Sequence, residues 1–149
     1  MVDRTEAKIF DEFIGTVKDV ALEPSSLDTE IDQYHVVIKP LDVEVAGKTG
    51  MMHEWVRVPA TATETSVPEG SGIDLFLRDL EACSRDVRQV KNVADAFNFM
   101  KDKTFKFVKG KIGKAFKGKE AGEHWLPKRL FESDDEVKKA IADSPNKKK

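Results

Sequence analysis

The sequence has very little that would allow cross-linking or membrane insertion. A single cysteine, Cys83, means that no disulfide can form within the chain. No apolar run approaches the roughly 20 residues that a helix needs to cross a bilayer. The first six residues lack the basic and then apolar pattern of a secretory signal. These absences predict a cytoplasmic protein with no membrane partner, which includes a virus-encoded protein acting in the cytoplasm of its host.

Motifs for catalysis and metal binding are also missing. His35, His53 and His124 fall in three separate predicted strands, without His-x-His or Cys-x-x-Cys spacing. Glycines and lysines between residues 110 and 118 lack the spacing of a phosphate-binding loop, and the acidic residues are too scattered to define a carboxylate pair. We therefore predict neither an enzyme nor a bound metal or other cofactor, and we expect Cys83 to pack as a small apolar residue.

Charge is unevenly distributed along the 149 residues, although the net charge is only −2. Residues 1–85 carry 8 Lys or Arg and 17 Asp or Glu, a net charge of −9. Residues 99–130 carry 10 Lys or Arg and 3 Asp or Glu, a net charge of +7. A basic stretch of this kind is one sign of a polyanion partner, although charged runs also occur simply as solvated surface.

Five segments rich in β-branched and aromatic residues predict a mainly β protein, and they cover residues 12–23, 34–43, 51–58, 104–111 and 124–131. Apolar residues repeat at helical spacing between the third and fourth segments, in 73–85, behind a capping Ser71. Residues 92–100 predict a second short helix, and 134–143 predict a C-terminal one. We expect a leader at 1–11, one domain at 12–131, and a helical appendage with a disordered lysine tail at 132–149.

Alternation along the strands separates candidate core residues from candidate ligand-binding residues. His53, Trp55 and Arg57 share one face of the third predicted strand, so this face combines aromatic and basic side chains. Phe105 and Phe107 alternate with polar residues and are expected in the core.

Proteins bind single-stranded nucleic acid without sequence preference through two kinds of contact: cations contact the phosphates, and bases stack on aromatic rings. The candidate nucleic-acid-binding residues are Lys39, His53, Trp55, Arg57, Lys106, Lys109, Lys111, Lys114, Phe116, Lys117, Lys119, Trp125, Lys128 and Arg129.

Across residues 12–131 the chain resembles the oligonucleotide-binding (OB) fold group, particularly single-stranded DNA-binding proteins of the phage or archaeal type. The resemblance rests on the order of elements and on five phrases: Gly15-Thr-Val-Lys-Asp-Val, Tyr34-His-Val-Val-Ile-Lys-Pro-Leu-Asp, Trp55-Val-Arg-Val-Pro, Lys103-Thr-Phe-Lys-Phe and Trp125-Leu-Pro-Lys-Arg-Leu-Phe. It implies an OB-like β-barrel of five strands, with one or two helices between strands three and four and a short C-terminal helix. It also implies a ligand groove across strands two and three. The acidic first half and the extra element at 92–100 depart from a simple version of the family.

The resulting hypothesis is binding of single-stranded DNA without sequence specificity, with RNA as the second candidate ligand. Protein partners from replication or recombination would accompany this role, and a homo-oligomer remains open. The alternative hypothesis is a protein-interaction or assembly module on the same barrel, which the acidic half and the pair Met51 and Met52 beside Trp55 favour.

Overall fold

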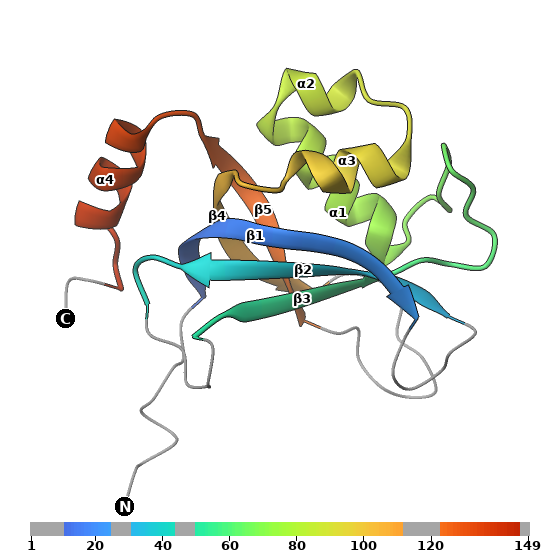
Figure 1. Cartoon of the computed structure of the whole chain (residues 1–149), viewed down its shortest axis with the longest axis horizontal. Helices are drawn as coiled ribbons and strands as arrows, with labels where there is room; N and C mark the ends of the chain where they lie inside the picture. The colour runs from blue at the N-terminus through green and yellow to red at the C-terminus, as the bar shows by residue number, and fades with distance from the viewer. Residues whose placement is uncertain (1–10, 25–30, 44–49, 112–122, 147–149) are drawn as a thin grey trace, which may run out of the picture.

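The computed structural model describes residues 11–24, 31–43, 50–111 and 123–146, and of Lys111 it describes only the backbone. The described elements follow the chain in the order β1 (Glu12–Pro24), β2 (Asp32–Pro40), β3 (Met52–Arg57), α1 (Gly72–Cys83), α2 (Arg85–Arg88), α3 (Val93–Phe99), β4 (Thr104–Lys111), β5 (Glu123–Phe131) and α4 (Asp134–Ala142). The protein is therefore mainly β with several short helices (Figure 1).

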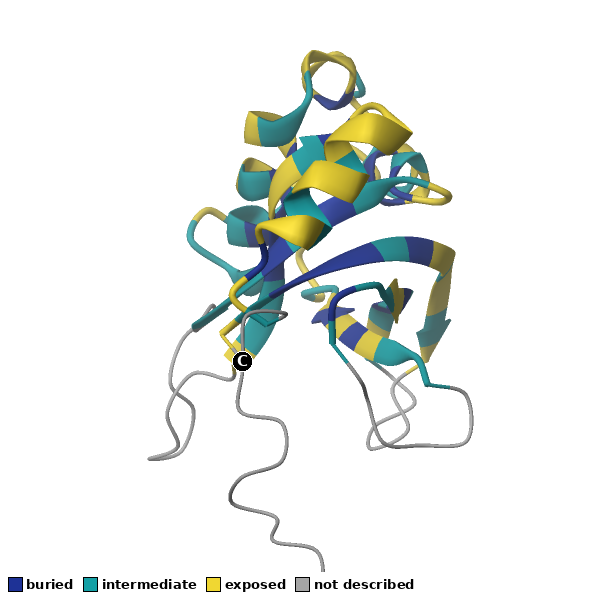
Figure 2. Ribbon diagram, turned by 90° about the vertical axis from the view of Figure 1, so that its left-hand side faces the viewer, coloured by how far each residue is buried: buried dark blue, intermediate teal, exposed yellow. Residues whose placement is uncertain are grey.

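The five strands form one antiparallel sheet in the order β3-β2-β1-β4-β5. Strands β3 and β5 are its two edges, so the sheet is open in the described residues. The long strand β1 connects its two halves, because Glu12–Thr16 pairs with β4 while Gly15–Pro24 pairs with β2. The first half of β1 is largely buried and its second half is largely exposed, as the change from dark blue to teal and yellow shows in Figure 2.

Gly15 allows β1 to cross close to β2. A Cβ atom at this position would lie 2.5 Å from Ile38 Cγ2 and 2.8 Å from Phe13 Cε2, closer than carbon atoms approach one another. Two residues further on, the register with β2 shifts between Val17 and Asp19, which marks a β-bulge. The close crossing and the bulge occur where β1 passes from its β4 pairing to its β2 pairing.

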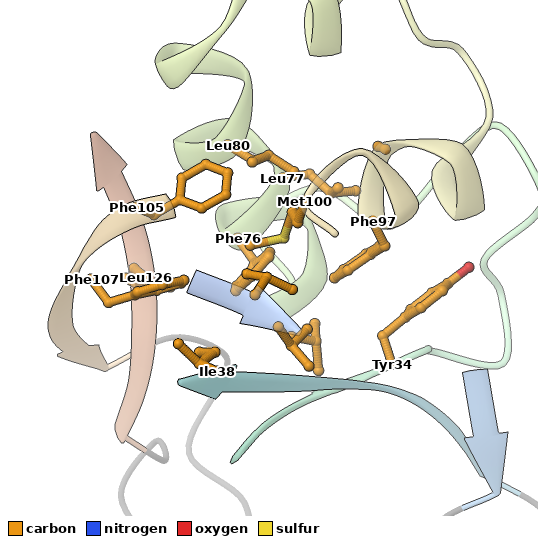
Figure 3. Close-up of a cluster of buried hydrophobic side chains, with 14 of the residues drawn as sticks. Tyr34, Ile38, Phe76, Leu77, Leu80, Phe97, Met100, Phe105, Phe107 and Leu126 are labelled. Atoms are coloured by element: carbon orange, nitrogen blue, oxygen red, sulfur yellow. The ribbon is translucent and has the colours of Figure 1, made fainter. Parts of the chain in front are cut away.

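The helices α1 and α3 cover the face of the sheet that carries its apolar side chains (Figure 1). Tyr34 and Ile38 point from β2 toward these helices in Figure 3. The Tyr34 ring stacks on Phe97 of α3, with ring centroids 4.0 Å apart and planes 3° apart. Phe76 of α1 also stacks on Phe97, with ring centroids 5.3 Å apart. Burial raises the pKa of the Tyr34 hydroxyl, and the nearby carboxylate of Asp95 raises it further.

The C-terminal helix α4 is attached mainly by polar contacts and contains no fully buried residue. The hydroxyl of Ser144, just after α4, donates to the buried carboxylate of Asp42 at 2.5 Å. Asp42 also accepts the N–H of Ile14 at 2.8 Å, and the amide of Asn146 donates to the carbonyl of Glu12 at 2.7 Å. These hydrogen bonds connect the end of the described chain to β1 and to the residues after β2.

The buried side chain of Glu54 connects the two edges of the sheet. Glu54 of β3 is 5% exposed, and its carboxylate accepts the backbone N–H of Trp125 in β5 at 2.5 Å. The same carboxylate lies 2.8 Å from His124 Nδ1 and accepts the N–H of Trp55 at 2.9 Å. Side-chain hydrogen bonds thus join β3 to β5, where a closed sheet would have a backbone ladder.

The sequence-based prediction of five strands and their order is confirmed, with boundaries shifted by up to three residues. Ser71 accepts the N–H of Asp74 as the expected N-cap of α1, and the expected helix near 92–100 is α3, capped by Asn92. Three helices lie between β3 and β4 where one or two were predicted. The additional one, α2, has four residues, too few for a helical apolar repeat to be visible. No helix in the described part of the chain is long and apolar enough to cross a bilayer.

Candidate nucleic-acid interface

The candidate interface is the face of β2 and β3 that points away from the helices, which we call the outer face. Alternation in β3 places Glu54 and Val56 on the buried side and leaves His53, Trp55 and Arg57 exposed. The register pairs His35 of β2 with Trp55, so the two rings lie side by side on the outer face. The predicted division of β3 into a core face and an exposed face is therefore confirmed.

Three nearly parallel aromatic rings lie together on the outer face, each within 5.6 Å of the other two. The centroids of His35 and Trp55 are 4.9 Å apart with planes 15° apart. His53 is 5.6 Å from Trp55 and 5.0 Å from His35, with interplanar angles of 15° and 30°. We call these residues the three-ring stack. Trp55 is 43% exposed, one of two large apolar side chains in the described chain with substantial exposure.

Hydrogen bonds fix the two imidazoles of the three-ring stack. His35 Nε2 lies 2.7 Å from His53 Nδ1, and His35 Nδ1 lies 3.2 Å from a carboxylate oxygen of Glu23 in β1. These two contacts orient the His35 ring. The stack is a pre-arranged flat surface of the kind on which a nucleic-acid base can stack.

Two cations and two carboxylates surround the stack. Arg57 and Lys39 are exposed at opposite ends of the outer face, and neither forms an ion pair with a described residue. Glu23 and Asp19 lie on the neighbouring β1, where the register places Asp19 opposite Val37. The potential of the outer face is therefore more positive at its ends and more negative along its β1 side.

Four other predicted cations that the structure describes are held by carboxylates or aromatic rings. The Lys106 ammonium lies 3.3 Å from Glu12, and that of Lys128 lies 2.9 Å from Asp79 of α1. The remaining contacts are those of Lys109 with Glu123 at 3.9 Å and with the Trp125 ring at 5.4 Å, and of Arg129 with the Phe131 ring at 4.8 Å. The structure therefore does not gather these four cations beside the three-ring stack.

Trp125 packs against the core. Its ring meets Phe13 edge-on at a centroid distance of 4.9 Å, and Phe13 is 1% exposed. Its partly buried position makes it less available to a ligand than Trp55. Lys114, Phe116, Lys117 and Lys119 lie outside the described residues, as does the side chain of Lys111, and their role stays a prediction.

A cavity of about 420 Å³ lies between α4 and strands β1, β4 and β5. Lys106 and Arg129 line it together with Glu12, Ile14 and Phe131. The cavity wall also includes Glu136, Lys139 and Asp143 from the α4 side. Because cations and carboxylates are mixed along its wall, the cavity has no dominant charge that would select a polyanion.

Cys83 lies at the end of α1, where its thiol contacts the carbonyl of Pro127 at 3.5 Å. Burial raises the pKa of this thiol to about 11, and the Asp79 carboxylate contributes to the increase while Lys128 opposes it. A thiol held protonated in this way is a poor nucleophile. In the described ranges, no group of three or more His, Cys, Asp or Glu side chains is placed to hold a metal.

Sequence reasoning missed three residues of the site: His35, Glu23 and Glu54. His35 shares a face with Lys39 in the predicted second strand, which was a usable signal. Glu54 stands at an apolar position of an alternating strand, and a charged residue there indicates a buried hydrogen-bonded carboxylate. Glu23 gave no signal, because its contact with His35 depends on the register between β1 and β2.

No protein-family model matches the sequence, and no curated protein matches it significantly. The chemistry of the outer face is therefore the basis for a functional assignment.

Proposed function

We propose that this protein binds single-stranded DNA without sequence specificity, along the outer face of β2 and β3. The observation that carries the proposal is the three-ring stack, in which Trp55 is 43% exposed beside two fixed imidazoles. Stacking of a base on an exposed aromatic ring contributes about 1–3 kcal/mol and depends little on base identity. Arg57 and Lys39, which form no ion pair with a described residue, supply phosphate contacts at the two ends of the stack.

The strand order supports an OB-like barrel as the scaffold of this proposal. In such a barrel five strands close with the third and fifth as neighbours, and ligands cross strands two and three. Here β3 and β5 are the sheet edges, and the Glu54 side chain of β3 accepts a hydrogen bond from the Trp125 backbone of β5. The lysine-rich segment 112–122 connects Lys111 of β4 to Glu123 of β5, which pair with each other. Glu123 lies two residues before Trp125, whose N–H donates to Glu54.

A titration with a fluorescently labelled thirty-nucleotide oligothymidine at low salt tests the proposal. We expect binding in the micromolar range or tighter, with an affinity that falls as salt concentration rises. Trp55→Ala should weaken binding by about five- to 150-fold, which corresponds to the loss of about 1–3 kcal/mol of stacking. The matched control is Leu22→Ala, because Leu22 is the other exposed large apolar residue, at 55% exposure, and lies near the end of β1.

Absence of micromolar binding by the unaltered protein would overturn the proposal. An equal loss of affinity in Trp55→Ala and Leu22→Ala would locate the ligand away from the outer face.

A protein-interaction role is the second candidate, and the carboxylates beside the stack favour it. Glu23 and Asp19 repel phosphate along the β1 side of the outer face, whereas a basic partner protein would be attracted there. Trp55 would then serve as an apolar anchor of the interface. This candidate would be favoured if the protein does not bind the oligonucleotide but binds a basic partner protein, and if Trp55→Ala abolishes that binding.

A further inference from the structure

His35 and His53 present two imidazole nitrogens to each other across neighbouring strands. The distance from His35 Nε2 to His53 Nδ1 is 2.7 Å, which requires one nitrogen to carry a proton and the other to accept it. The register pairs His35 with Trp55 and Val37 with His53, so the two histidines occupy diagonal positions on the outer face. Both imidazole planes lie within 15° of the Trp55 ring plane.

The contact with Glu23 determines which nitrogen of His35 is available. Its carboxylate lies 3.2 Å from His35 Nδ1 and can only accept a hydrogen bond, which favours the neutral tautomer with the proton on Nδ1 and the lone pair on Nε2. That lone pair points at His53. A carboxylate that accepts the second N–H of an imidazole is the usual outer partner of a metal-binding histidine, because it orients the ring and makes the other nitrogen more basic.

We propose that His35 Nε2 and His53 Nδ1 bind one divalent transition-metal ion, which replaces the proton they share. Metal–nitrogen bonds are about 2.0–2.1 Å long, so a tetrahedral ion needs the two nitrogens about 3.3 Å apart. The observed separation is shorter by about 0.6 Å, a difference that small rotations of the rings supply. The His35 side chain is 20% exposed and His53 is exposed, so the rings have room to move and the ion has access.

The site has two protein ligands. Glu23 lies on the far side of His35 from His53, so it orients His35 and does not reach the ion. Water fills the remaining positions, and binding is accordingly weaker than in a closed four-ligand site. Imidazole ligands suit zinc, nickel and copper, and divalent copper binds most tightly to a given set of nitrogen ligands.

A metal titration of the full chain, without an affinity tag and in chelator-treated buffer, tests the proposal. Ni²⁺ and Cu²⁺ quench nearby tryptophan fluorescence, and the Trp55 ring centroid lies 4.9 and 5.6 Å from those of His35 and His53. We expect saturable quenching with one equivalent bound. Zn²⁺, which does not quench in this way, should restore the fluorescence by displacement, and its own binding should be measurable by calorimetry.

Three substitutions test the ligands and their orientation. His53→Asn keeps an amide that can donate to His35 but removes the metal ligand, and His35→Gln does the same from the other strand. Each should reduce affinity at least about tenfold. Glu23→Gln should reduce it by about ten- to 100-fold through the loss of orientation. Circular dichroism of each variant establishes that it is folded.

Matched controls are His124→Asn, which removes the imidazole that contacts Glu54, and Asp19→Asn, which removes a carboxylate on the same face that does not contact His35. Both should bind the metal as the unaltered protein does.

Zn²⁺ binding that stays undetectable up to about 1 mM, or affinity unchanged in folded His35→Gln and His53→Asn, would overturn the proposal. No nucleic acid is present in these experiments, so their outcome is independent of DNA binding.

Discussion

The two halves of the sheet differ in whether their basic side chains form ion pairs. On the outer face of β2 and β3, Arg57 and Lys39 remain free of ion pairs with described residues, beside exposed aromatic rings. On β4 and β5, Lys106 and Lys128 each meet a carboxylate, and α4 covers part of this half of the sheet.

The carboxylates that pair with Lys106 and Lys128 come from the acidic first half of the chain. Glu12 is in β1 and Asp79 is in α1, whereas their partners lie in β4 and β5. Folding therefore places two cations of the basic stretch beside carboxylates of the acidic first half. A run of lysines identifies a basic surface only when the fold does not supply acids beside it.

The largest expected effect is on the free energy of unfolding, and it distinguishes the buried core from the exposed outer face. Phe107→Ala removes a buried ring that stacks on Phe13 at 5.2 Å, and it should lower the free energy of unfolding by about 3–5 kcal/mol. Trp55→Ala removes an exposed ring and should change it by about 0.5 kcal/mol or less. Urea denaturation of both variants measures the contrast. A loss in Trp55→Ala as large as that in Phe107→Ala would mean that the three-ring stack is a structural element.

Loss of the polar contacts that attach α4 should leave strands β2 and β3 intact. Asp42→Ala leaves the Ile14 N–H and the Ser144 hydroxyl without their acceptor, and it should cost about 1–3 kcal/mol. Hydrogen exchange should show lost protection in α4, with protection retained in β2 and β3. Asp19→Ala removes an exposed carboxylate and serves as the control, with no expected change in α4. Protection of α4 that survives Asp42→Ala would show that the helix is held by other contacts.

A smaller effect distinguishes free from paired cations in DNA binding. Each phosphate contact of a single strand contributes about 0.7 to the slope of log affinity against log salt. Arg57→Ala should reduce the slope by about that amount, whereas Lys128→Ala should leave it unchanged because Lys128 is paired with Asp79. Oligothymidine titrations at several salt concentrations measure both slopes. Equal reductions would extend the ligand path onto β5.

A further effect is chemical and concerns the thiol of Cys83 at the end of α1. With its pKa raised to about 11, only about one thiol in a thousand is ionised at pH 8. Alkylation by iodoacetamide should therefore be slow in the folded protein and rise about tenfold per pH unit toward pH 11. The unfolded chain in urea, whose thiol has its ordinary pKa, is the control and should react much faster at pH 8. Equal rates in the two states would contradict a raised pKa.

The sequence predicts the strands well because alternation and β-branched residues are local signals. The faces of β3 are correct for this reason, and so are the buried positions of Phe105 and Phe107. The pairing of Lys106 with Glu12 and of Lys128 with Asp79 depends on which segments become neighbours, and that information is not local. The role of His35 was missed for a similar reason, because its partners Glu23 and His53 come from two different strands.

The close crossing of β1 over β2 has a consequence for how this protein can vary. Every side chain other than hydrogen at position 15 begins with the carbon atom that would collide with Ile38 and Phe13. In a library of all single substitutions, position 15 should tolerate none of the nineteen alternatives, while the exposed neighbour Lys18 accepts most of them. A relative of this protein, however distant in the rest of its sequence, is expected to retain glycine there or to carry a smaller residue in place of Ile38.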